Sequence, residues 1–377
     1  MLPHSRSIAC LLLSGICCAQ SNRPIGNQQA FITPDLERAV NKGHDYLASQ
    51  QDPRGFWAQD IGFKHRNDYN VTGHAGHVGV TALALMSFLA GGHVPGRGKY
   101  GQVLTNGLEY VLECVRENGF IADNGSRMYS HAFATLLLAE VYGMTHRRDV
   151  RDALNRAITV IVDSQNSEGG WRYQLFARES DMSITVCQVM ALRSARNVGV
   201  TVPRSTIERA ENYVKASAGG NGRGSSRRSR FGYSYGGYVN SGGAFRYQKR
   251  GNSRSTFSLT AAGVTTLFAA GNYESSLIPP ALEYLDGQLR MFNAQNGPNA
   301  GGHYFYYYGH YYAVQAFFVA GDPHWSKYFR EVKKDLLGSQ QADGRWLCEI
   351  GPGDVFGTAI ATLVMQIPYQ YLPIFQR

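Results

Sequence analysis

The stretch Ser164–Gln174, SQNSEGGWRYQ, decides the fold, because its pattern of glutamine, glycine and tryptophan occurs three times. In each copy a glycine lies four residues after the glutamine, and the tryptophan lies two residues further on. Glycine lets the backbone reverse after a helix, the glutamine amide can bond a helix end, and tryptophan covers a large apolar area. We therefore predict a structural turn with a buried tryptophan at Gln51–Trp57, Gln165–Trp171 and Gln340–Trp346.

A pair of helical patterns flanks each turn. The segments before the turns carry apolar residues at steps of three and four, as surface helices do, and they span residues 36–50, 153–165 and 329–340. The segments after the turns are apolar on nearly all sides, as buried helices are, and they span residues 78–91, 184–196 and 357–367. Weaker copies between them bring the total to six helical hairpins. We predict an all-α fold, an α/α toroid of six outer and six inner helices, with an open helical array as the alternative.

The chain divides into four parts. Residues 1–19 have a basic start, an apolar stretch and a small residue at Ala19, which is typical of a secretory signal peptide. The pattern predicts export to the periplasm or cell envelope, and a buried N-terminal helix is the alternative. Residues 20–33 are a predicted linker, and residues 34–374 are the toroid domain. No apolar run long enough to span a membrane follows the leader.

A basic insertion interrupts the repeat at residues 218–254. It is rich in Gly, Ser, Arg and Tyr, and it holds eight Lys and Arg residues and no acid, out of a net charge of +9. This composition predicts a solvated loop, and the alternative is contact with an anionic polymer or membrane surface. Nucleic acid is not an expected partner of an exported protein. The three cysteines beyond the leader form no CxxC pair, so neither a disulfide framework nor a cysteine zinc site is predicted.

The three turns resemble the repeats of the squalene cyclase and prenyltransferase superfamily. As a single exported toroid, the chain resembles the prenyltransferase and squalene-oxidase repeat proteins of planctomycete type. The resemblance spans nearly all of the chain after the leader and implies an isoprenoid-like ligand in a central cavity. The family's acid motif D-x-D-D-T-A matches Asp181–Val186, DMSITV, where Ser183 and Ile184 replace the central acids. His310 resembles the zinc histidine of prenyltransferases, but the Asp and Cys partners are absent from the preceding inner helix, so neither chemistry carries over.

A polar residue lies four positions before a Thr or Tyr near the start of each inner helix. In a closed ring these residues would surround one mouth, and four of them come from neighbouring units. Two histidines and two carboxylates suit a divalent metal or acid–base catalysis; helix capping by the aspartates and ordinary burial of the histidines are the alternatives. The six residues are His77, His131, Asp181, Thr256, Tyr308 and Asp354. The candidate catalytic residues are Asp181, His131 and Asp354, and the candidate ligand-binding residues are His77, Tyr129, Thr256, Tyr308 and His310.

Three classes of function fit these patterns. The dense tyrosines of residues 304–312 suit a cavity that holds a hydrocarbon or a sugar, with plain core packing as the alternative. The first class is binding, with or without transformation, of an apolar isoprenoid-like ligand. The second is an exported carbohydrate-active enzyme of pectate-lyase type, and the third is a non-catalytic envelope scaffold. A deep aliphatic cavity favours the first class, an open basic cleft with a divalent site favours the second, and a sealed core favours the third.

Overall fold

The computed structural model describes residues 28–62, 72–219, 242–250 and 253–376. The predicted signal peptide, most of the predicted linker and most of the basic insertion lie outside these residues. The described chain contains twelve α-helices: α1 (Pro34–Ser49), α2 (Val78–Ala90), α3 (Gly101–Glu113), α4 (Met128–Thr145), α5 (Arg148–Asp163), α6 (Met182–Asn197), α7 (Arg204–Ser217), α8 (Phe257–Ala269), α9 (Ile278–Asn296), α10 (Tyr304–Ala320), α11 (His324–Ser339) and α12 (Asp354–Gln366). Two short antiparallel strands, β1 (Ala58–Ile61) and β2 (Thr72–Gly76), lie between α1 and α2.

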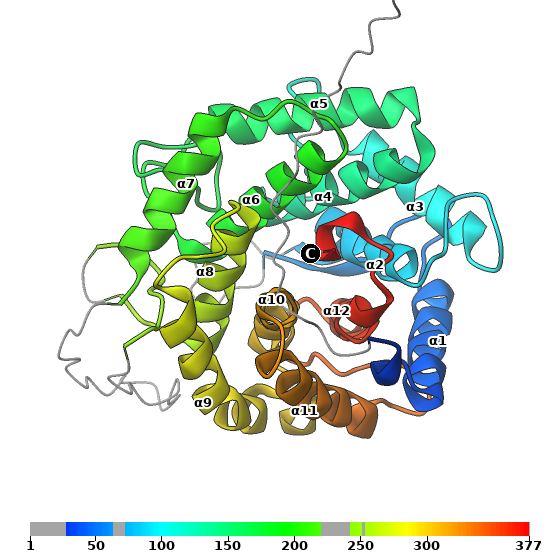
Figure 1. Ribbon diagram of the computed structural model, residues 1–377. Coiled ribbons are helices and arrows are strands. Elements are labelled where there is room, and N and C mark those ends of the chain that lie inside the picture. Colours follow the sequence, from blue (N-terminus) through cyan, green and yellow to red (C-terminus); the bar gives the residue numbers. More distant parts are fainter. Residues whose placement is uncertain (1–27, 63–71, 220–241, 251–252, 377) are drawn as a thin grey trace, which may run out of the picture.

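The even-numbered helices form a closed inner ring, and the odd-numbered helices surround it (Figure 1). Each inner helix packs on the next one, and α12 packs back on α2, which closes the ring. Every residue of α2 is buried, whereas α5 buries only one stripe. The difference follows from sequence, because a helix apolar on all sides must be enclosed and an amphipathic helix covers a core with one face. The predicted six-hairpin α/α toroid is confirmed, and the open array is excluded.

The three predicted turns are built from the same hydrogen bonds. Each tryptophan is buried and donates its indole N–H to the outer helix that precedes it, at Leu47, Ile161 and Leu336, over 2.7–2.8 Å. Each tryptophan backbone N–H bonds a threonine hydroxyl of the following inner helix, at Thr81, Thr185 and Thr358. Each glutamine amide donates to the carbonyl of its own turn's glycine and to the next outer helix, at Val103, Thr206 and Ala39. The motif therefore joins one hairpin to the next.

Glycine is required in these turns for two reasons. Gly55, Gly169 and Gly344 have φ of +95°, +92° and +95°, which is a region that other residues rarely adopt. A Cβ on any of the three would lie 2.1–2.3 Å from a backbone carbonyl oxygen of the neighbouring outer helix. The glycine thus allows the turn to reverse and lets the next outer helix approach its backbone.

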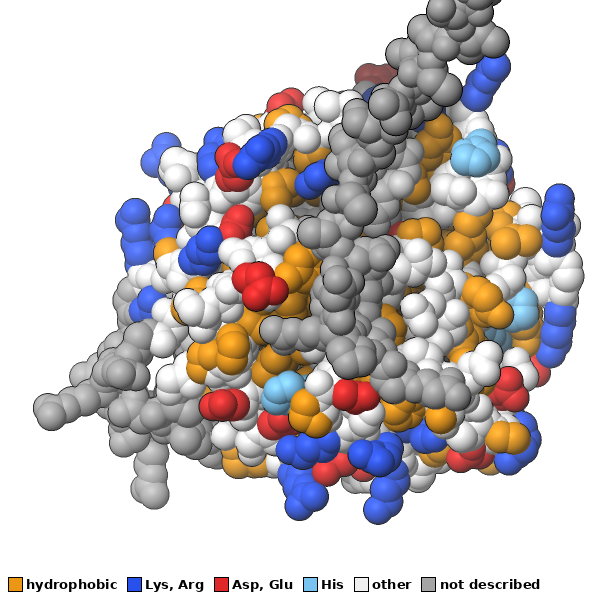
Figure 2. Space-filling model, viewed as in Figure 1, with side chains coloured by type: hydrophobic (Ala, Val, Ile, Leu, Met, Phe, Trp, Pro, Cys, Tyr) orange, Lys and Arg blue, Asp and Glu red, His pale blue; other side chains and the backbone are white. Residues whose placement is uncertain are grey.

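The C-terminal segment closes one mouth of the ring. After α12 two 3₁₀ turns, η3 (Ile367–Tyr369) and η4 (Pro373–Phe375), lie over the centre of the ring in Figure 1. Ile374 and Phe375 are buried, and η4 packs on α6. On the same face Lys and Arg side chains lie around the rim with Asp and Glu among them (Figure 2). Within the described residues no helix is long and apolar enough to cross a membrane.

Candidate functional site

A cavity of about 720 Å³ lies inside the ring, at the end opposite the C-terminal segment. The N-terminal halves of the inner helices form its wall, and residues of α9 and the segment before α8 extend it toward solvent. Its volume is in the range of small-molecule binding sites. Because α-helix N-termini surround it, the side chains near the start of each inner helix determine its chemistry.

Most of the cavity wall is apolar. The aliphatic and aromatic side chains come from all sides of the ring and leave a single carboxylate, Asp60, among the described lining residues. Met291 and Ile350, each 37% exposed, are apolar residues of the same lining. Apart from the tyrosines, the apolar lining residues are Ile61, Val80, Leu83, Phe133, Phe257, Leu259, Met291, Phe292, Phe305, Ile350, Pro352, Phe356 and Ile360.

One side of the wall is polar, and Asp181 lies behind it. The carboxylate is fully buried at the N-terminus of α6, where Oδ1 accepts from the backbone N–H of Ile184 at 2.9 Å and from the Ser183 hydroxyl at 2.7 Å. Oδ2 accepts from the Tyr247 hydroxyl at 3.2 Å, and Tyr247 in turn bonds the Tyr173 hydroxyl at 2.7 Å. Burial raises the pKa of Asp181, and the three hydrogen bonds oppose the rise.

Four of the predicted ligand-binding residues line the cavity. His77 caps α2 and Thr256 caps α8, so each side chain accepts a backbone N–H while it borders the cavity. Tyr129 and Tyr308 face the cavity from α4 and α10, and their rings meet edge-on at 6.5 Å. Burial lowers the pKa of His77 to about 4, so this imidazole is neutral at physiological pH.

His131 and His310 serve the packing between helices. His131 Nδ1 accepts from the N–H of Ile121, so Nε2 carries the proton and donates to the carbonyl of Ala157 in α5. His310 bonds Tyr328 of α11 and Asn293 of α9. Both are buried, neither borders the cavity, and burial lowers both pKa values to about 3. His310, a predicted ligand-binding residue, is therefore not part of the cavity wall.

The predicted convergence of His77, His131, Asp181 and Asp354 on one mouth was wrong. His77 borders the cavity, His131 faces an outer helix and Asp181 is buried behind the wall. Asp354 bonds backward to the N–H of Cys348 at 2.8 Å and pairs with Arg345 at 3.5 Å. Capping explains Asp181 as expected, but Gly353 is the residue before α12, so Asp354 is not its cap. Within the described ranges no group of His, Cys, Asp and Glu has the geometry to hold a metal ion.

The register error has a specific cause. In unit two the Nδ1 atom of His131 accepts the backbone N–H of Ile121, the contact that a threonine hydroxyl makes in the three tryptophan turns. His131 is therefore the structural equivalent of Thr81 and Thr185, one helical turn away from the position that the sequence alignment assigned to it. A histidine and a threonine can exchange here because each side chain offers an acceptor atom for the same backbone N–H.

Sequence reasoning missed Tyr173 and Tyr247. Tyr247 lies in the described end of the basic insertion, which the composition predicted to be a solvated loop. Its backbone is fixed instead: the N–H of Met182 donates to the Tyr247 carbonyl, and the Tyr247 N–H donates to the Arg254 carbonyl. Nothing in the sequence places Tyr247 beside α6, because the contact joins segments that are 65 residues apart and depends on the packing of α8 against α6.

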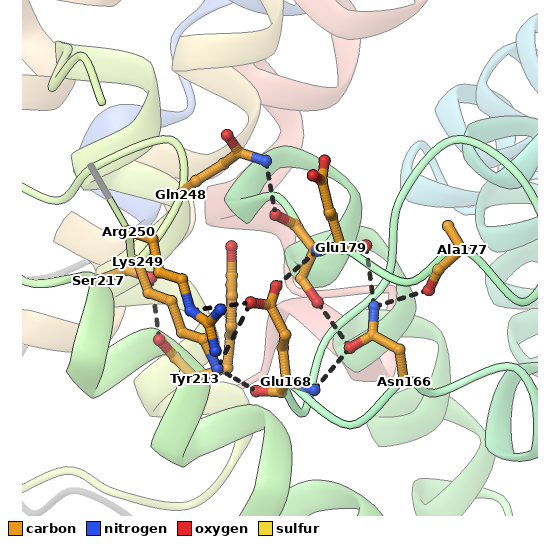
Figure 3. Close-up of polar contacts among 10 residues, drawn as sticks. Asn166, Glu168, Ala177, Glu179, Tyr213, Ser217, Gln248, Lys249 and Arg250 are labelled. Carbon is orange, nitrogen blue, oxygen red and sulfur yellow. Dashed lines mark hydrogen bonds and ion pairs between the residues drawn. The ribbon is translucent and has the colours of Figure 1, made fainter. Parts of the chain in front are cut away.

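The basic residues after Tyr247 pair with an acid on the neighbouring turn (Figure 3). Glu168 lies 3.8 Å from Lys249 and 3.6 Å from Arg250, and its second oxygen accepts from the N–H of Ser180. Gln248 donates to the Ser180 carbonyl, and Lys249 to the Glu168 carbonyl. Lys249 and Arg250 thus both lie beside Glu168, Arg250 with a largely exposed side chain, and the bonds of Gln248 and Lys249 to backbone carbonyls attach the segment that carries Tyr247 to this turn.

Comparison with solved structures supports the toroid fold. Type II terpene cyclase MstE from Scytonema, in complex with geranylgeranyl dihydroxybenzoate, is 12% identical with a TM-score of 0.58, covering 90% of this chain and 98% of that one. The GH76A α-1,6-mannanase of Salegentibacter is 10% identical with a TM-score of 0.60, covering 89% and 99%. At this identity the likeness shows the fold alone: a terpenoid-cyclase-like α/α toroid.

Two further comparisons give no family for the chain. A model described as chromatin associated protein KTI12 matches residues 129–216, which is less than half of the chain and covers α4 to α7. The matched residues contain only two of the six helical hairpins that make up the ring. The match therefore does not assign the whole domain to that family. No curated protein matches.

Proposed function

We propose that the protein binds an apolar, isoprenoid-like molecule in the central cavity, in the manner of the exported repeat proteins that its turns resemble. The observation that carries the proposal is the 720 Å³ cavity, whose wall is mainly aliphatic and aromatic. Transfer of apolar surface out of water into such a site is favourable at about 25 cal/mol per Å². A cavity of this kind also argues against the envelope scaffold, which has no need of one.

The lining argues against acid-initiated cyclisation by the family's usual route. Ser183, which lines the cavity, stands where the family has an acid, and Ile184 is fully buried. The remaining aspartate of the motif, Asp181, makes three hydrogen bonds as an acceptor. We therefore propose ligand binding as the primary function, without protonation of an alkene by this motif.

A glycosidase is the second candidate, favoured by the similarity to the α-1,6-mannanase. Glycoside hydrolysis commonly uses two carboxyl groups on either side of the bond, about 5–10 Å apart. The described lining offers only Asp60, whose Oδ1 accepts from the N–H of His74. The carboxylate count thus supports the apolar ligand over the sugar.

The experiment measures displacement of an apolar fluorophore by farnesol, by squalene and by manno-oligosaccharides. We expect the isoprenoids to displace the fluorophore at a one-to-one ratio and the sugars to have no effect. Leu83→Trp, which fills the cavity, should weaken isoprenoid binding at least tenfold. Leu337→Trp, on the outer helix α11 and away from the cavity, is the matched control and should bind as the wild type does. Binding of sugars alone would reverse the assignment.

A further inference from the structure

One side of the outer helix α9 belongs to the cavity lining. Tyr284, Gln288, Met291 and Gln295 follow one another at steps of three and four residues, and all four border the cavity. Residues at these steps share one side of a helix, and the rise from Tyr284 to Gln295 along the axis is about 16 Å. The leucines of α9 are buried. The helix therefore covers the core with one side and presents a second, elongated side to the cavity.

The polar groups on this side of α9 have unused hydrogen-bonding capacity. Gln288 and Gln295 have no hydrogen-bond partner among the described residues, and neither has the hydroxyl of Tyr284. Each amide offers two N–H hydrogens and one acceptor oxygen. On the inner helices, by contrast, the hydroxyls of Ser183 and Tyr308 already donate to protein acceptors. The helix α9 thus offers a ligand two complete amide groups and a phenol.

The position of this side of α9 decides which part of a ligand meets it. The apolar wall lies between the inner helices, whereas α9 extends the cavity toward solvent. A ligand whose hydrocarbon tail lies against the apolar wall therefore passes α9 with its other end. Met291, which is 37% exposed, and the Tyr284 ring place apolar surface beside the two amides. This side of α9 fits a head that has both polar and apolar groups, over a length that a single hydroxyl cannot fill.

The donors and acceptors on α9 match hydroxyl groups. A hydroxyl both donates and accepts, so it can use the N–H hydrogens and the oxygen of an amide, whereas an anion can use only the hydrogens. A sugar ring carries hydroxyls at its edge and C–H groups on its faces, and those faces can pack on Tyr284 or Met291. The cations of the lining do not oppose such a head, because a guanidinium, as in Arg127 and Arg254, donates to neutral oxygens as well as to anions.

We propose that Tyr284, Gln288 and Gln295 form a subsite for the polyhydroxyl head of an apolar ligand. The hydrocarbon tail lies between the inner helices, and a head of one or more sugar rings lies along α9. The proposal rests on the proposed function and adds to it the chemical class of the ligand: a glycosylated isoprenoid rather than a plain hydrocarbon or alcohol. A free oligosaccharide lacks the tail, so it is still expected to leave a bound fluorophore in place.

The test compares four ligands with the same tail by fluorophore displacement: farnesol, farnesyl β-maltoside, farnesyl phosphate and a farnesylated dipeptide amide. We expect the maltoside to bind at least about tenfold more tightly than farnesol, because two or more neutral hydrogen bonds are added. Gln288→Ala combined with Gln295→Ala should reduce this ratio to below about threefold and leave farnesol binding within about twofold of the wild type. Tyr284→Phe, which keeps the ring, should lower the ratio by about threefold. Gln102→Ala, at an exposed position of the outer helix α3, is the matched control and should leave the ratio unchanged.

The outcomes separate the subsite on α9 from the proposed function. Equal binding of the maltoside and farnesol by the wild type, or an advantage of the maltoside that persists in the double alanine variant, would overturn the subsite, while farnesol binding leaves the proposed function standing. Tighter binding of the phosphate or of the dipeptide amide than of the maltoside would also overturn it, in favour of an anionic or a peptide head. Failure of both farnesol and the maltoside to displace the fluorophore would overturn the proposed function itself.

Discussion

Removal of one tryptophan of the repeated turn should cost several kcal/mol of stability. Trp171 is 1% exposed and donates its indole N–H to the Ile161 carbonyl at 2.8 Å. A buried indole removes about 150–250 Å² from water, which is worth about 4–6 kcal/mol at 25 cal/mol per Å². Alanine keeps part of that area, so we expect Trp171→Ala to lower the free energy of unfolding by about 3–5 kcal/mol.

The loss can be read as a shift in melting temperature. Unfolding entropy of about 2.1 cal/mol/K per residue gives roughly 0.7 kcal/mol/K for a domain of about 340 residues. The expected shift is therefore about 4–7 °C, measured by circular dichroism on heating and, for the free energy, in urea. Trp57→Ala and Trp346→Ala should fall within the same range, because both indoles are buried and make the same bond.

The fourth tryptophan supplies a matched contrast. Trp325 is also fully buried, but its indole N–H has no hydrogen-bond partner. Trp171→Phe removes the indole donor and leaves the Ile161 carbonyl with the Ser164 hydroxyl at 3.3 Å. It should cost about 1–3 kcal/mol more than Trp325→Phe, because Trp325→Phe removes a buried donor that has no partner. Equal costs for the two phenylalanine variants, or a Trp171→Ala melting point within 1 °C of wild type, would refute the assigned role of the turn.

Three other outcomes test the fold and the chain's processing. Gly169→Ala should destabilise the protein strongly, because its Cβ would lie 2.3 Å from the Arg209 carbonyl oxygen. Gly199→Ala should cost less, because Gly199 has a similar φ and open space around it; the midpoints of urea unfolding of the two variants are compared. Burial lowers the pKa of His310 to about 3, whereas a histidine of the unfolded chain has a pKa near 6.5. The unfolded chain therefore takes up the proton first, and the free energy of unfolding falls as the pH drops from about 6.5 toward 3. His310→Gln should make this fall less steep, as measured by urea unfolding midpoints from pH 8 to pH 4. Protein from the native host should begin near Gln20 by N-terminal sequencing, and an intact Met1 on most molecules would contradict the predicted leader.

The architecture could be predicted from the sequence because each of its signals is local. The spacing of glutamine, glycine and tryptophan in Gln165–Trp171 lies within seven residues, and two of the turn's hydrogen bonds, from Gln165 to Gly169 and from Trp171 to Ile161, join groups at most ten residues apart. The amphipathic and wholly apolar helices carry their own burial pattern. With six such hairpins, closure into a ring is the arrangement that buries both sides of every unit.

The site could not be predicted, because it depends on contacts between distant segments and on shifts of a single helical turn. Spacing alone placed His131 beside His77, but a four-residue offset in unit two turned His131 toward α5. Tyr247 came from a segment with the composition of a loop, and the contacts of Glu168 with Lys249 and Arg250 hold that segment in place. The sequence by itself determined the helices, the turns and the ring. Only the tertiary structure decided which side chains face the cavity, because the direction of a side chain in a closed ring is set by packing against helices that the local sequence does not specify.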